Sequence, residues 1–401
     1  KLGSYTGSDH NGNDKSIAGY VTGPIINDVL AYSLSLYARD MAGYLTNDVT
    51  GQGTGGHEKW FARGKLLWEP SENTSIELHF FKTDRQDLET FATTALNGNS
   101  SAAFWDDGIV ASRAWHVATE LKGGSQPLLV KQESFSLKIS HYFDGVGTLT
   151  STTSANDYQT EFTVDLDTGT SAACKATFVC ADFFQDYPSE DFQQEFLFTS
   201  DPMGKLSFVA GLYFYENDAG FDGNFAPVIN STGYAIRDQS LAGFISGSTV
   251  FVESQALFGS LTYEISDQLR LTLGGRYNDE SIVGVGTYSG KVFPNGGELS
   301  DKTFTPRVAV HFDISDTLSI YGSYTEGRKG PILQSFSTAD DYADYEDVEA
   351  IELGIKASGD NYRFNGAIFS YDYKNFQDQV WDGSASLLGN AESAEMQGIE
   401  L

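Results

Sequence analysis

The feature that most constrains this chain is an alternation of apolar and polar residues along many segments. In Leu206–Phe214 every second residue is apolar, and Phe304–Phe312 and Phe135–Ile139 follow the same rule. A period of two residues is typical of a β-strand, because successive side chains point to opposite faces of the sheet. We find no comparable helical stripe, so the sequence predicts an all-β protein.

Sixteen segments with this alternation are predicted to be strands, and the first and last are interpreted as truncated. They cover residues 1–6, 15–23, 29–40, 58–69, 75–84, 132–143, 148–158, 190–200, 205–217, 251–265, 268–278, 302–313, 317–326, 346–358, 361–373 and 391–401. Many of them exceed the ~5–6 residues that are common in soluble sheets. A tilted strand that crosses a membrane needs ~9–11 residues, so these lengths favour membrane-spanning strands.

The connections between these strands alternate between short turns and long loops. Short turns such as Pro24–Asp28 and Pro70–Thr74 are rich in turn-forming residues, whereas polar loops such as 85–131 and 159–189 separate the hairpins. In an up-and-down antiparallel chain, every second connection lies at the same end. Short turns at one end and long loops at the other are typical of a transmembrane β-barrel. We therefore expect a transmembrane antiparallel up-and-down β-barrel.

The composition agrees with a barrel and excludes one class of partner. The chain of 401 residues has 25 Lys and Arg against 55 Asp and Glu, a net charge of −30. Nucleic-acid binding needs clustered positive charge, so it is excluded. Hydrophobic residues make up 40% of the chain, below the ~45–50% of globular domains. A barrel needs little apolar core, because lipid surrounds its outer face and its inner face is polar.

Several segments, in their order along the chain, resemble the β-barrel of TonB-dependent outer-membrane receptors of the iron-complex type. Val21–Asp28 resembles the first periplasmic turn of that family, and Tyr321–Pro331 resembles its Y-x-S-Y-S-x-G-F-K-x-G segment. Asn390–Glu400 fits the pattern N-A-x-x-A-x-x-x-G-x-E. Phe192–Ser200 resembles a mid-barrel strand of the family, but Phe198 occupies the position of its usual arginine.

The resemblance implies a barrel of 22 strands around an N-terminal plug. About 16 strands would then be present, and residues 1–401 would be a partial barrel domain from which the plug and the closing strands are absent. It also implies a multi-pass protein in the outer-membrane lipid of a Gram-negative bacterium. Such a receptor takes up a scarce nutrient, here a ferric siderophore or similar iron complex. It couples to the TonB energy-transducing complex through its N-terminal region and uses no cofactor.

The long loops supply the candidate ligand contacts, and no catalytic constellation or metal motif stands out. Aromatic residues and an arginine lie in or beside these loops, namely Tyr44, Trp105, Trp115, Arg328 and Trp381. Such residues are plausible ligand contacts in binding loops. The alternative is that they pack the loops against each other. The chain is therefore not expected to be an enzyme.

Two further features of the loops each leave two interpretations open. Cys174 and Cys180 would close a small loop as a disulfide in an oxidising compartment, or they remain unpaired thiols. The acidic run at 340–347 is interpreted as a solvated loop, with a calcium site as the alternative. In either case we expect this run at the long-loop end of the barrel, facing outside water.

Two other functions compete with active uptake. A passive porin is compatible with sixteen strands, and an acidic lumen would favour cations. A secreted soluble β protein that binds glycans is the third hypothesis. A plug domain upstream of the barrel would support active uptake over the porin. A monodisperse product without detergent would contradict both membrane hypotheses.

Overall fold

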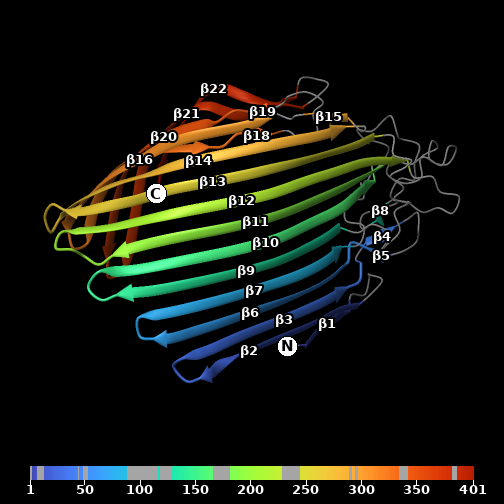
Figure 1. Ribbon diagram of the computed structural model, residues 1–401, viewed down its shortest axis with the longest axis horizontal. Coiled ribbons are helices and arrows are strands. Elements are labelled where there is room, and N and C mark those ends of the chain that lie inside the picture. Colours follow the sequence, from blue (N-terminus) through green and yellow to red (C-terminus); the bar gives the residue numbers. More distant parts are fainter. Residues whose placement is uncertain are drawn as a thin grey trace.

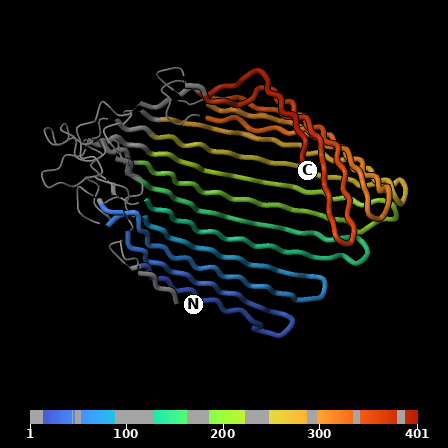
Figure 2. The backbone as a smooth tube through the Cα atoms, turned by 180° about the vertical axis from the view of Figure 1, so that it is seen from behind, coloured from blue at the N-terminus to red at the C-terminus, as the bar shows by residue number. Residues whose placement is uncertain are grey.

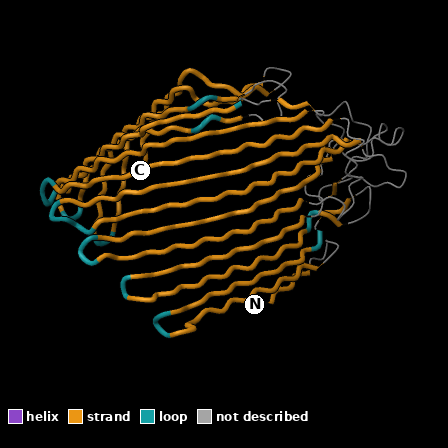
Figure 3. The backbone as a smooth tube through the Cα atoms, in the orientation of Figure 1, coloured by secondary structure: helices purple, strands orange, loops and turns teal. Residues whose placement is uncertain are grey.

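The computed structural model describes most of the chain outside the longest loops. The described residues are 2–6, 13–43, 45–47, 53–87, 116–117, 128–165, 181–227, 244–288, 291–293, 297–333, 342–381 and 386–401. All regular elements within these ranges are β-strands, as Figures 1 and 3 show. The described residues include no helix long and apolar enough to cross a membrane.

Within these ranges seventeen strands form one antiparallel sheet, which contains all sixteen predicted strands. The long strands are β1 (Leu2–Thr6), β2 (Asn13–Ile26), β3 (Leu30–Met41), β6 (His57–Ser71), β7 (Thr74–Asp87), β9 (Leu128–Phe143), β10 (Gly147–Asp165), β11 (Ala181–Ser200), β12 (Leu206–Pro227), β13 (Phe244–Glu264), β14 (Leu269–Tyr288), β16 (Glu298–Ser315), β17 (Leu318–Lys329), β20 (Glu346–Gly359), β21 (Tyr362–Trp381) and β22 (Ser386–Glu400). Each of them pairs with its neighbours in chain order. The all-β, up-and-down prediction is therefore confirmed.

Short strands occur at one end of this sheet. β15 (Lys291–Phe293) adds to β14, and β18 (Ile332–Leu333) pairs with β19 (Tyr342–Ala343). A small three-stranded sheet combines β4 (Leu45–Asn47), β5 (Gly53–Thr54) and β8 (His116–Val117). The tight turns lie at the opposite end of the sheet (Figure 3). We call the two ends the long-loop end and the short-turn end.

The sheet is a strongly curved wall, whose last strands turn across the direction of the others (Figures 1 and 2). β1 pairs only with β2, and β22 pairs only with β21, within the ranges that the structure describes. Those residues therefore form an open curved sheet rather than a closed ring.

Several strands extend further toward the long-loop end than the sequence predicts. The ladder between β10 and β11 continues to Asp165 and Asp182, so the loop predicted over 159–189 is much shorter. Likewise β12 runs to Pro227 and β13 begins at Phe244, so both extend into the region between the strands predicted over 205–217 and 251–265. These outer parts carry polar residues on both faces, so they lack the apolar period on which the prediction depends.

The two faces of the sheet differ in polarity. Residues that lie opposite each other on neighbouring strands point to the same face. Phe80 lies opposite Phe135 on one face, whereas His79 lies opposite Ser136 on the other. Large apolar side chains of the first face are open to the surroundings, and Leu257 is 58% exposed. The apolar residues thus cover a surface and do not form a core.

The polar face is the concave face of the wall. Along β16, Asp301, Thr303 and Thr305 are half-buried, whereas Lys302 and Phe304 on the other face are exposed. No other layer covers either face in the described structure (Figure 1), so the difference arises from curvature. The arrangement matches the polar interior and apolar exterior of a membrane barrel.

On the convex face, charged residues mark where the apolar band ends toward the long loops. A row of opposed residues on four strands consists of Lys82, Glu133, Asp157 and Glu190. On β16 the apolar residues run from Phe304 to Phe312, close to the ~9–11 residues of a membrane strand. Part of the negative charge therefore lies on the strands themselves and not in the loops alone.

Candidate functional site

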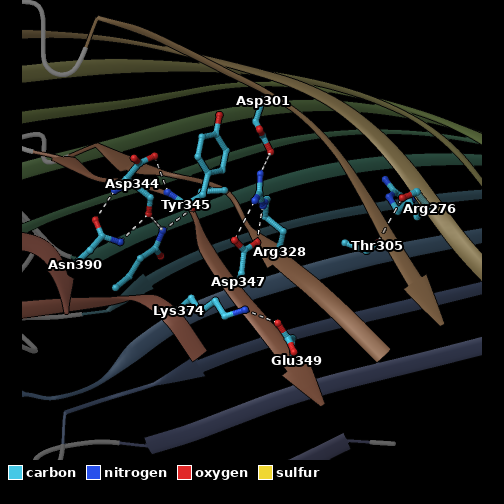
Figure 4. Close-up of polar contacts among 12 residues, drawn as sticks. Arg276, Asp301, Thr305, Arg328, Asp344, Tyr345, Asp347, Glu349, Lys374 and Asn390 are labelled. Carbon is cyan, nitrogen blue, oxygen red and sulfur yellow. Dashed lines mark hydrogen bonds and ion pairs between the residues drawn. The ribbon is translucent and has the colours of Figure 1, made fainter. Parts of the chain in front are cut away.

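A cluster of charged and aromatic residues lies at the long-loop end, where β17 separates from β16. Pairing between these two strands ends at Arg307 and Thr325. Pairing between β17 and β20 continues to Lys329 and Glu346. Beyond Thr325, therefore, β17 still pairs with β20 but no longer pairs with β16. Arg328 lies in this gap (Figure 4).

The guanidinium of Arg328 joins three strands. Its Nε and Nη2 atoms donate to the two carboxylate oxygens of Asp347 on β20, at 2.6 and 2.9 Å. Its Nη1 atom donates to Asp301 on β16 at 2.6 Å. The bidentate geometry is the strong form of this interaction. Arg328 thus replaces the missing backbone ladder with a side-chain bridge between β16 and β20.

An aromatic ring completes this bridge. The ring of Tyr345 lies beside Arg328, with its centroid 5.3 Å from Cζ, a cation–π distance. Burial raises the pKa of Tyr345 to about 12, and the carboxylates of Asp301 and Glu280 add to the effect. The hydrogen bonds that Arg328 donates to Asp347 raise the pKa of Arg328 further above its ordinary value. Both side chains therefore keep their protonated forms throughout the physiological pH range.

A half-buried carboxyl group lies behind the bridge. Burial raises the pKa of Glu280, on β14, and the neighbouring carboxylate of Asp301 raises it further. A Cβ atom added at Gly330 would overlap Glu280 Oε1. The chain after β17 therefore runs directly against β14, which encloses the carboxyl group.

Amides fix the adjoining strands at the same end. Gln377, only 8% exposed, donates from Nε2 to the carbonyl oxygens of Gly330 at 2.7 Å and Asp344 at 2.9 Å. Asn390 on β22 donates to Asp344 O at 3.0 Å and accepts a hydrogen bond from Asp344 N at 2.7 Å. These contacts hold the acidic segment before β20 against β21 and β22. The described part of the acidic run, residues 342–347, lies at the long-loop end, as predicted.

Of the predicted ligand contacts, only Arg328 has a described side chain. All of its nitrogens that approach a partner bind carboxylates of the wall, so its predicted ligand contact would require exchange of those partners. Trp381 is the last residue of β21, and its side chain is not described. The remaining predictions fall outside the described residues, namely Tyr44, Trp105, Trp115, Cys174 and Cys180.

Sequence reasoning missed the partners of Arg328. Asp301 lies in a segment predicted to be a loop, and Gln377 carries no motif. Asn390 was visible as the first residue of a family pattern, and Asp344 and Asp347 belong to the acidic run. No group of three or more metal-binding side chains that could hold an ion occurs within the described ranges.

The concave face below this cluster carries charges of both signs in two sectors. On β3, β6, β7 and β9, cations exceed carboxylates, and they comprise Arg39, Lys59, Arg63, Lys65, Arg85 and Lys138. On β11, β14, β16 and β20, carboxylates exceed cations, and they include Asp191, Glu195, Glu280, Asp301 and Glu352. The wall can therefore interact with solutes of either charge, depending on the sector.

Comparison with known proteins gives a family match over most of the chain. The profile of the family described as TonB dependent receptor-like, beta-barrel matches residues 37–401. A search of curated proteins gave no match. The ferric yersiniabactin uptake receptor FyuA from Yersinia pestis is similar in structure, with 16% identity and a TM-score of 0.71. The structural match covers 96% of this chain and 55% of the FyuA chain.

Two further solved structures show the same fold. The copper transporter OprC has 15% identity and a TM-score of 0.68, covering 99% of this chain and 56% of its own. The siderophore receptor PiuA from Acinetobacter baumannii has 14% identity and a TM-score of 0.67. This match covers 99% of this chain and 59% of the PiuA chain. Such identities show the fold alone. The chain spans about half the length of the solved receptors that it matches.

Proposed function

The chain belongs to the TonB-dependent receptor β-barrel family, and from this premise we propose that it takes up a ferric siderophore or similar iron complex. The family consists of outer-membrane transporters and not of enzymes. In this proposal the sheet is the wall of the receptor, its convex face contacts outer-membrane lipid, and its concave face lines the solute path. Energy for uptake comes from the TonB complex.

The family match over residues 37–401 is the observation that carries the proposal. The wall agrees with it, because the polarity of its faces suits lipid outside and water inside. Iron is the finer part of the proposal. It is supported by two similar structures, which are a ferric yersiniabactin uptake receptor and a siderophore receptor. The copper transporter in the same group makes copper the competing cargo.

We also propose that residues 1–401 are part of a barrel domain that further strands and a plug complete. The share of the solved receptors that the chain covers, 55–59%, supports this arrangement. The plug would carry the segment that contacts TonB. On this proposal the charged cluster around Arg328 stabilises the mouth of the wall, and the long loops provide the first contacts with the iron complex.

Growth of a strain that lacks the gene tests the cargo. We expect the deletion to abolish growth on one ferric siderophore under iron limitation, while growth on ferrous iron is unchanged. Deletion of TonB should give the same defect, because uptake depends on it. A defect that appears only with copper complexes, or only with cobalamin, would assign a different cargo.

Conductance separates this proposal from the passive porin. The purified receptor in a planar bilayer should show no steady ion current, because a plug closes the lumen. A steady cation-selective current from the full receptor would favour the porin. The third hypothesis, a soluble glycan-binding protein, requires a monodisperse product without detergent, which the exposed apolar face makes unfavourable.

A further inference from the structure

A pocket of about 330 Å³ opens on the concave face of β6, β7, β9 and β10. Two neighbouring rows of opposed residues form it. The first row consists of Lys65, His79, Ser136 and Ser154, and the second consists of Arg63, Phe81, Ser134 and Asn156. The pocket is therefore built from four strands of the rigid wall, about halfway along β6, and not from the long loops.

Two cations in this pocket differ from three other cations of the same sector, which have carboxylate partners. Arg39 pairs with Asp14 at 2.5 Å, and Lys138 approaches Glu77 at 3.7 Å. Arg85 similarly pairs with Asp87. Arg63 and Lys65 form no ion pair with any residue that the structure describes, and both are exposed to the lumen. Arg63 instead lies over the ring of Phe81, with Cζ 5.5 Å from its centroid.

Hydroxyl groups face these cations from the adjoining strands. Ser134 accepts a hydrogen bond from Gln132 at 3.1 Å, which leaves its O–H free to donate. Ser136 and Ser154 continue the row toward β10. On the far side, Asn156 donates to Asp191 at 2.8 Å, so a carboxylate closes the pocket at β11. Anions are therefore favoured on the β6 side and repelled on the β11 side.

We propose that this pocket binds a carboxylate or phosphate group in the interior of the receptor. Arg63 offers a planar fork that matches two oxygens of such a group, and Lys65 offers a point charge beside it. The serine hydroxyls supply further donors without adding charge. The chain has a net charge of −30, so two adjoining cations without a described carboxylate partner favour an anionic group at this place.

The group that binds has two possible sources within the proposed function, on which this inference rests. It belongs either to a solute that passes through the lumen or to an acidic side chain of the receptor segment that fills the lumen. Both sources present the same oxygens to Arg63 and Lys65. A binding measurement and a cross-linking measurement on the complete receptor distinguish them.

The binding measurement uses citrate and inorganic phosphate as probes on the complete receptor in detergent at low salt. If the source is a solute, calorimetry should show one saturable site that weakens with added NaCl. Arg63→Gln combined with Lys65→Gln should weaken binding at least tenfold. The matched control is Lys82→Gln, because Lys82 lies on β7 but on the convex face, and it should leave binding within twofold.

The cross-linking measurement uses the unaltered receptor and a carbodiimide, which joins an amine directly to a nearby carboxylate. If the source is the receptor itself, Lys65 should form an amide with an Asp or Glu of a segment that fills the lumen, and the probes should not bind. The proposal is overturned if the double variant binds the probes as tightly as the unaltered receptor does. The proposal is also overturned if the probes do not bind and Lys65 forms no cross-link. A cross-link from Lys65 to Glu77 alone is counted as no cross-link.

The growth test of the proposed function remains separate from these outcomes. A receptor that supports siderophore growth but shows neither binding nor the cross-link overturns the pocket alone. A receptor whose pocket binds citrate, but whose deletion leaves growth unchanged on every iron source, overturns the proposed function alone. Heat-dependent mobility in gel electrophoresis confirms that the double variant is folded before either comparison is made.

Discussion

Arg328 and Asp347 lie directly opposite each other on β17 and β20, and two hydrogen bonds of 2.6 and 2.9 Å join their side chains. The same guanidinium reaches Asp301 on β16 at 2.6 Å, beyond the last residue pair of the β16–β17 ladder. The strand alternation would place Arg328 and Asp301 on opposite faces. They meet because the two strands have separated at this level.

Replacement of Arg328 by Gln should loosen the long-loop end of the wall. Both partner carboxylates would lose a charged donor, and a hydrogen bond to a charged group contributes about 1.5–3 kcal/mol. We expect faster hydrogen exchange in the outer parts of β16, β17 and β20, with the membrane-spanning parts unchanged. Lys374→Gln is the control, because its pair with Glu349 is exposed to water and contributes little to stability. Equal exchange in both variants would contradict the role of Arg328.

Removal of the Tyr345 hydroxyl should stabilise the protein. This oxygen is buried and has no hydrogen-bond partner in the described structure. Tyr345→Phe keeps the ring beside Arg328 and removes the unpaired polar atom, which costs about 1–3 kcal/mol when buried. We therefore expect a higher urea midpoint at neutral pH. A lower midpoint would indicate that the hydroxyl has a partner.

The same residue predicts a pH dependence at alkaline pH. The folded pKa of Tyr345 is raised from 10.0 to about 12, so the unfolded chain loses this proton first. Relative to its stability below pH ~10, the folded protein therefore loses stability as the pH rises toward ~12. Tyr345→Phe should reduce the loss of stability across this window, as measured by unfolding at each pH. Parallel curves for the two proteins would exclude this group as a cause.

Gly354 should not tolerate a side chain. It lies opposite Tyr321 on the concave face, and an added Cβ would overlap the tyrosine ring. Gly354→Ala would displace that ring from its place beside Glu352, and overpacking of this kind costs about 1–3 kcal/mol. Gly64→Ala is the control, because no atom lies within 4 Å of the added Cβ. Equal unfolding midpoints for the two variants would contradict this account.

A charged substitution in the convex apolar band should destabilise the protein more when it lies deeper in the membrane. Leu353 lies within the band on β20, whereas Glu349 lies beyond its edge. Leu353→Arg should destabilise the folded receptor by about 2–4 kcal/mol, and Glu349→Arg by about 0–1 kcal/mol. Unfolding from lipid vesicles measures both values. Similar costs at the two positions would place the membrane boundary elsewhere.

The sequence predicts the membrane-spanning wall well for a physical reason. Lipid on one side and water on the other impose a period of two, and residues such as Phe304 and Thr305 report it directly. The outer parts of β11 and β13 were predicted as loops, because apolar and polar residues do not alternate along them. Their strands are recognisable only from backbone pairing.

The cluster around Arg328 was accessible only in part. Its arginine was selected as a residue beside a long loop, and Asn390 belongs to a family pattern. Its bridge to Asp301 depends on where the β16–β17 ladder stops, which no local pattern encodes. Gln377 is buried by strands far apart in sequence, so its contacts with Gly330 and Asp344 required the register of the sheet.

The division of the concave face into a cationic and an acidic sector has an electrical consequence. Lys65 and Arg63 belong to one sector, and Glu280 and Glu352 belong to the other. One sector has an excess of positive charge and the other an excess of negative charge, so a potential difference exists along the concave face, across the strands. A molecule with distinct anionic and cationic ends would experience a torque in this field. It would therefore lie against the concave face in one preferred orientation.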